Sequence, residues 1–86
     1  MMQNKILIVD DEESIRQLLR FNLEKAGYEV LEAQAGNIAL QAAKNEKPDL
    51  IILDLMLPEV DGLDVCRLLK GQTATAGIPI IMLTAR

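Results

Sequence analysis

The chain has 86 residues, a length that allows one small domain. Half of its residues are hydrophobic but only 2% are aromatic, so we expect a globular core built from aliphatic side chains. The net charge is −4 and there is no basic run, which argues against direct nucleic acid binding by this segment. The single cysteine, Cys66, excludes an internal disulfide. Because nothing resembles a signal peptide or a membrane span, we expect a cytoplasmic chain that makes no membrane contact.

The first half of the chain predicts two strands and one helix. Residues 5–10 form a continuous apolar run, which is typical of a strand buried on both faces of a parallel sheet. Gly27 stands where a helix commonly ends in a left-handed residue, and a short strand is expected after it, over 28–33. A helix is expected over 13–26, where apolar residues recur at helical spacing: Ile15, Leu18, Leu19, Leu23 and Ala26.

The second half continues the alternation. We expect an alanine-rich helix over about 37–45 and a second fully apolar strand over 49–54. A loop broken by Pro58 and Gly62 leads to a helix over about 63–70, with Val65, Leu68 and Leu69 on one face, and a last apolar strand is expected over 78–83. This alternation of strands and helices indicates an α/β fold, with a parallel sheet, right-handed crossovers and helices on both faces.

Acidic residues stand at the carboxyl ends of two predicted strands: Asp10 and Asp11 after the first, and Asp54 after the third. Ligands bind beyond these ends at the point where the strand order reverses, so the three acids converge if the two strands are neighbours. Clustered carboxylates repel one another unless a cation lies among them, and hard oxygen ligands in a chain without histidine suit Mg²⁺. Taken alone, the first pair could instead be charge at a helix N-terminus, and the third acid a turn residue.

A carboxylate at this position can also be a nucleophile. Asp54 could attack phosphorus to form an aspartyl-phosphate, with Mg²⁺ offsetting the charge on the phosphoryl oxygens. Thr84 ends the last predicted strand, so its hydroxyl could reach the same crevice and bond a phosphoryl oxygen.

Three motifs resemble the receiver domain of response regulators in two-component signalling: ILIVDDE at 6–12, PDLIILDLMLPEVDG at 48–62 and PIIMLTAR at 79–86. The resemblance implies a flavodoxin-like sheet of order 2-1-3-4 in which Asp54 accepts phosphate from a sensor histidine kinase. It further implies that Mg²⁺ is held by Asp10, Asp11 and Asp54 and by the backbone carbonyl of Met56, with Asp11 a direct ligand. Thr84 matches the family's switch hydroxyl, and Pro58 and Gly62 match the loop that shapes the acceptor's pocket.

The family's domain continues with a further helix, strand and helix, including a lysine that contacts the phosphoryl group. Residues 1–86 therefore correspond to the N-terminal βαβαβαβ portion of a receiver, without an output domain. We expect the 86-residue chain to be a poor phospho-acceptor and to self-associate, as a dimer, through its uncovered last strand. The sequence around Leu57, Pro58 and Thr84 is most like that of regulators with a C-terminal winged-helix DNA-binding domain. This likeness implies an output in transcription.

Two other classes of function stay open. A magnesium-dependent phosphatase resembling the haloacid dehalogenases would also form an aspartyl-phosphate, but it places a second acid two residues after the nucleophile, where this chain has Met56. A binding-only module would keep the fold without phosphorylation, which the acid pair, Asp54 and Thr84 argue against. We therefore expect a phospho-accepting signalling domain rather than an enzyme acting on an external substrate.

Overall fold

The computed structural model describes residues 4–55, 57 and 61–83. Every predicted helix and strand is present, with ends that differ from the prediction by two residues or fewer. In chain order the elements are β1 (Lys5–Val9), α1 (Glu13–Lys25), β2 (Glu29–Ala33), α2 (Gly36–Glu46), β3 (Leu50–Asp54), α3 (Gly62–Lys70) and β4 (Ile80–Leu83). None of the helices in these residues has the length and apolar character needed to cross a membrane.

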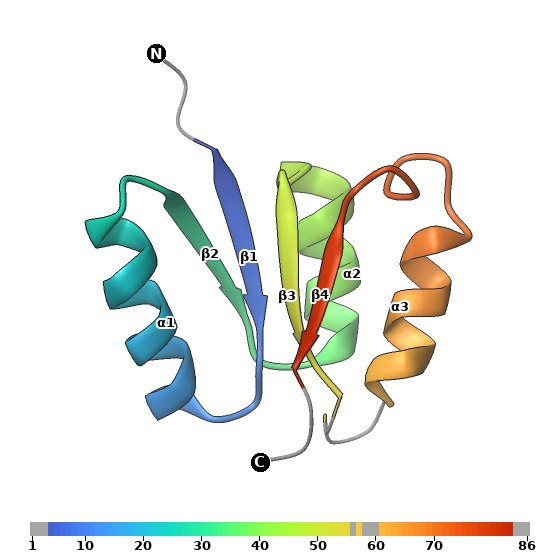
Figure 1. Ribbon diagram of the computed structural model, residues 1–86. Coiled ribbons are helices and arrows are strands. Elements are labelled where there is room, and N and C mark those ends of the chain that lie inside the picture. Colours follow the sequence, from blue (N-terminus) through green and yellow to red (C-terminus); the bar gives the residue numbers. More distant parts are fainter. Residues whose placement is uncertain (1–3, 56, 58–60, 84–86) are drawn as a thin grey trace.

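The four strands form one parallel sheet in the order β2-β1-β3-β4 (Figure 1). The chain first moves outward from β1 to β2 and then crosses back over β1 to reach β3. Because right-handed crossovers in opposite directions place their helices on opposite faces, α1 covers one face, and α2 and α3 cover the other. The predicted flavodoxin-like order is confirmed, and the strand order reverses between β1 and β3.

The main core lies between the sheet and the pair α2 and α3. The small residues Ala39 and Ala43 let α2 approach the sheet closely, and Val65 and Leu69 supply the contact from α3. All buried hydrophobic side chains of the described residues are aliphatic, as the composition predicts. The cluster comprises Leu7, Val9, Ala33, Ala39, Ala43, Ile51, Leu53, Val65 and Leu69.

Not every apolar residue at helical spacing on α1 faces the sheet. Leu18 is 60% exposed, and the residue of this helix that is buried is Arg16. Arg16 and Arg20 are one turn apart, and both bond to β2. Leu18 is two residues from each, or about 200° around the helix, so the arrangement that turns the arginines inward turns this leucine outward. On α3, similarly, Leu68 is 47% exposed while Val65 and Leu69, spaced i and i+4, are buried.

The end of α1 follows the sequence prediction. Gly27 has a φ of +100°, in the region that favours glycine. The N–H of Gly27 donates to the carbonyl of Glu24 at 3.0 Å, and the N–H of Tyr28 donates to the carbonyl of Leu23 at 3.1 Å. This pair of bonds is a Schellman motif, which satisfies the last carbonyls of the helix and turns the chain into β2.

Candidate functional site

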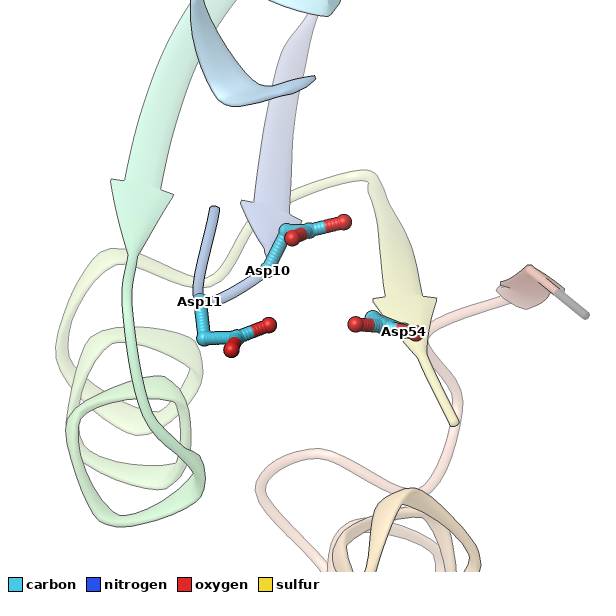
Figure 2. Close-up of side chains that lie close together, drawn as sticks. All are labelled: Asp10, Asp11 and Asp54. Atoms are coloured by element: carbon cyan, nitrogen blue, oxygen red, sulfur yellow. The ribbon is translucent and has the colours of Figure 1, made fainter. Parts of the chain in front are cut away.

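Two acids stand side by side because of the strand register. Val9 of β1 pairs with Leu53 of β3, and the residues that follow this pair are Asp10 and Asp54. Neighbouring strands are about 4.8 Å apart, so side chains one step beyond a register pair meet across that distance. Asp11 follows as the chain leaves β1, and Figure 2 shows its carboxylate turned toward that of Asp54.

The three carboxylates form a group of the size that a metal ion needs. One oxygen from each of Asp10, Asp11 and Asp54 lies within 4.8 Å of the others. Opposite oxygen ligands of an octahedral Mg²⁺ are about 4.2 Å apart, so small adjustments would bring these oxygens into its coordination shell. Asp10 and Asp54 are completely buried, whereas Asp11 is exposed. The donor set is all oxygen and strongly negative, which fits Mg²⁺, and the exposed acid leaves the group accessible from solvent.

Asp10 is held by three hydrogen bonds, two through its backbone and one through its carboxylate. Its N–H donates to the carbonyl of Ala33 on β2 at 3.1 Å. Its carboxylate oxygen Oδ1 accepts from the N–H of Glu12 at 2.8 Å, and its carbonyl accepts from Nη1 of Arg16 at 2.7 Å. These bonds hold the turn from β1 into α1 in one conformation.

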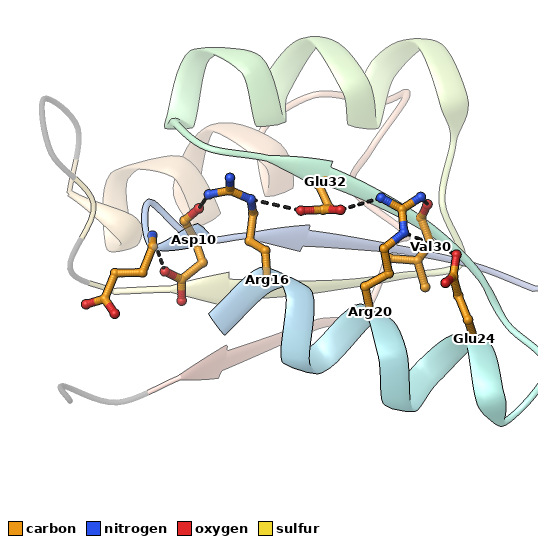
Figure 3. A network of polar contacts seen from close by, with 7 residues as sticks. Asp10, Arg16, Arg20, Glu24, Val30 and Glu32 are labelled. Atoms are coloured by element: carbon orange, nitrogen blue, oxygen red, sulfur yellow. Dashed lines mark hydrogen bonds and ion pairs between the residues drawn. The ribbon is translucent and has the colours of Figure 1, made fainter. Parts of the chain in front are cut away.

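Arg16 belongs to a network of charged residues between α1 and β2 (Figure 3). Its Nε donates to Glu32 at 2.9 Å, and the other carboxylate oxygen of Glu32 accepts from Arg20. Arg20 also donates to Glu24 at 3.1 Å and to the carbonyl of Val30 at 3.2 Å. The hydrogen bond with Glu24, followed by that with Glu32, raises the pKa of Arg20 above its usual value.

The sequence prediction missed this network because it followed only the apolar positions of α1. The signal was present, since Arg16, Arg20 and Glu24 recur every fourth residue and so share one side of the helix. The partner Glu32 could not be identified from spacing, because it lies on a different element.

Gly62 allows α3 to begin directly against the backbone that follows Asp54. Its N–H donates to the carbonyl of Leu55 at 3.1 Å. A Cβ at this position would lie 2.5 Å from the carbonyl oxygen of Asp54 and 2.6 Å from Cα of Leu55, so a side chain does not fit. Asp61 caps the helix by accepting from the N–H of Leu63 at 2.9 Å. This close approach gives a physical reason for the glycine that the resemblance predicts beside the acceptor.

Three predicted site residues, Met56, Pro58 and Thr84, lie outside the described residues, so their roles stay predictions. The strand before Thr84 ends at Leu83, which pairs with Asp54 across β3 and β4. Cys66 is half-buried and packs at the edge of the core.

Sequence comparisons identify the family of the chain. Residues 6–86 match the family model described as the response regulator receiver domain. The chain is 55% identical over 85 residues to the alkaline phosphatase synthesis transcriptional regulatory protein PhoP of Bacillus subtilis (strain 168), covering 99% of this chain and 35% of that protein. It is 51% identical over 81 residues to the DNA-binding dual master transcriptional regulator RpaA of Synechocystis, covering 94% of this chain and 34% of that protein. The chain thus spans about a third of the length of these curated relatives.

Solved structures of response regulators superpose closely on the fold of this chain. The chemotaxis response regulator CheY4 of Vibrio cholerae superposes with a TM-score of 0.93 at 38% identity, covering 99% of this chain and 71% of that one. The BeF3-activated N-terminal receiver domain of Klebsiella pneumoniae RstA superposes with a TM-score of 0.87 at 38% identity, covering 96% of this chain and 68% of that one. With the family match over residues 6–86, these likenesses lead to one conclusion: the chain belongs to the response regulator receiver domain family.

Proposed function

We propose that this chain receives a phosphoryl group on Asp54 in a Mg²⁺-dependent reaction, with a phosphohistidine on a sensor kinase as the donor. The observation that carries the proposal is the convergence of Asp10, Asp11 and Asp54, whose carboxylate oxygens lie within 4.8 Å of one another. Two of these acids are completely buried, so a cation among them would offset a repulsion that water screens only weakly.

In the proposed reaction an oxygen of the Asp54 carboxylate attacks the phosphorus of the phosphohistidine. The new P–O bond forms as the P–N bond breaks, and the imidazole leaves with the electron pair of that bond and takes a proton from solvent. Water later attacks the same phosphorus and returns Asp54 and inorganic phosphate. Mg²⁺, when bound, neutralises charge on the phosphoryl oxygens and helps to hold the reacting groups in line.

The residues of the chain have separate tasks in this proposal. Asp10 and Asp11 hold the cation beside Asp54, with the backbone carbonyl of Met56 as a further ligand. The hydroxyl of Thr84 donates to a phosphoryl oxygen and moves toward Asp54 after phosphorylation. A shift of this kind can bias a surface between two states, which would pass the signal on.

The whole protein is proposed to be a transcriptional regulator, because similar proteins carry that description in their names. A cytoplasmic location is part of the same proposal. The chain itself has a net charge of −4 and no basic run, so we assign DNA contact to a different part of that protein. Self-association of the regulator belongs to the same proposal.

The test is labelling of the natural gene product by a phosphohistidine donor, with and without Mg²⁺. We expect a hydroxylamine-labile phosphate that requires Mg²⁺ and is absent from Asp54→Asn. The matched control is Asp64→Asn, which changes an exposed acid of α3 paired with Arg67, and it should be labelled like the unaltered protein. Equal labelling of Asp54→Asn would place the acceptor elsewhere, and multiple turnover of small phosphate esters would favour a phosphatase.

A second variant separates acceptance from output. Thr84→Ala should accept phosphate but lose the downstream response, because the hydroxyl acts after the transfer. A Thr84→Ala protein that responds normally when phosphorylated would remove this residue from the proposal.

A further inference from the structure

We propose that Arg16 is a positioning residue for the metal site, which it serves by fixing the peptide between Asp10 and Asp11. This inference rests on the proposed binding of Mg²⁺ by the three aspartates. Arg16 itself is not proposed to touch the ion or the phosphoryl group.

The side chain of Arg16 is held in a single orientation. It is 8% exposed, and it donates in two directions, from Nη1 to the Asp10 carbonyl at 2.7 Å and from Nε to Glu32 at 2.9 Å. A guanidinium is planar, so two bonds from different nitrogens fix both its position and its plane. Figure 3 shows it lying between the turn that follows β1 and the strand β2.

The carbonyl that Arg16 binds is part of the peptide that leads into Asp11. The bond from Asp10 N–H to Ala33 fixes the preceding peptide, and the bond from Glu12 N–H to Asp10 Oδ1 fixes the following one. The bond from Arg16 acts on the peptide between them. Rotation about the Cα–C bond of Asp10 would turn that peptide and displace Cα of Asp11. The exposed carboxylate that faces Asp54 in Figure 2 would move with it.

Glu32 keeps Arg16 in place from the other side. Its second carboxylate oxygen accepts from Arg20, which is itself tied to Glu24 and to the carbonyl of Val30. The guanidinium of Arg16 is therefore already paired with an anion on β2. A merely neutralising role toward the aspartates would not need this second anchor.

Charge and geometry predict opposite effects of removing Arg16. If it acted only as a nearby cation, its loss would reduce repulsion of a divalent ion, and binding would tighten. If it positions Asp11, its loss releases the peptide, and binding weakens. Losing a group that orients a metal ligand commonly weakens metal affinity by about 10-fold or more.

The test is titration of the natural full-length product with Mn²⁺, followed by the electron paramagnetic resonance signal of the free ion and by displacement with Mg²⁺. We expect Arg16→Gln to weaken Mn²⁺ binding by about 10-fold. The matched control is Lys25→Gln, which removes one positive charge from the exposed last turn of the same helix, outside this network, and should leave the affinity unchanged. Equal or tighter binding by Arg16→Gln overturns the inference.

Two further variants exclude a simple loss of folding. Arg16→Lys keeps the cation but lacks the planar fork, so it should also bind more weakly, and wild-type affinity in this variant would overturn the inference. Asp11→Asn should weaken binding by itself, and adding Arg16→Gln to it should cause no further loss. Additive losses would show that Arg16 does not act through Asp11. If Asp11→Asn alone binds Mn²⁺ like the unaltered protein, it is the proposed metal site that fails.

Discussion

Replacing Gly62 with alanine should destabilise the fold, although alanine is the better helix former. The new Cβ would lie 2.5 Å from the carbonyl oxygen of Asp54 and 2.6 Å from Cα of Leu55. Both of these atoms belong to the backbone, so neither can rotate away as the end of a side chain can. The start of α3 or the segment after β3 must shift instead.

The size of the effect follows from two opposing terms. Overpacking of this kind costs about 1–3 kcal/mol, and contact with rigid backbone favours the upper end, about 3 kcal/mol. The higher helix propensity of alanine offsets about 1 kcal/mol of this cost at most. We therefore expect a net loss of about 2 kcal/mol in the free energy of unfolding. The clash falls on the carbonyl of Asp54, so phosphate acceptance should fall as well.

Urea denaturation followed by far-UV circular dichroism measures this loss. For a small domain, about 2 kcal/mol lowers the midpoint by about 1 M at an unchanged slope. Gly77→Ala is the matched control, because no atom lies within 4 Å of its added Cβ and its backbone is outside the left-handed region. A Gly62→Ala protein as stable as Gly77→Ala would refute the close approach of α3 to the end of β3.

Three other predictions concern packing and association. On α3, Leu69→Ala should cost about 2–5 kcal/mol in urea denaturation, whereas Leu68→Ala should cost far less because this side chain is 47% exposed; equal losses would contradict the packing. Thr75→Val should cost about 1 kcal/mol, since the buried hydroxyl donates to the carbonyl of Leu69 at 2.6 Å, and exposed Thr73→Val should be neutral in the same assay. The 86-residue polypeptide should self-associate in light scattering, and Ile81→Lys on β4, 51% exposed, should reduce this; a monodisperse monomer would refute the role of this face.

Local patterns in the sequence were enough to predict the elements and the position of the acids. Continuous apolar runs marked β1 and β3, since strands buried on both faces have no polar positions. The acids at the ends of these runs were then expected to lie close together, as they do, because parallel strands bring their carboxyl ends to one edge of the sheet. The role of Gly27 at the end of α1 was equally predictable, because a left-handed residue after a helix is usually glycine.

Only the tertiary structure decided which side of α1 faces the sheet. Leucines at helical spacing were compatible with an apolar inner face, but Arg16 is buried and Leu18 is exposed, because the arginines bond to β2. Hydrophobic spacing records which residues share a side of a helix, whereas the choice of side depends on partners elsewhere in the chain. Glu32 and the carbonyl of Asp10 are such partners, and the backbone behind Gly62 is another. The convergence of the three acids was thus predictable from the sequence, while the hydrogen bonds around Asp10 exist only after β1, β2 and α1 have come together.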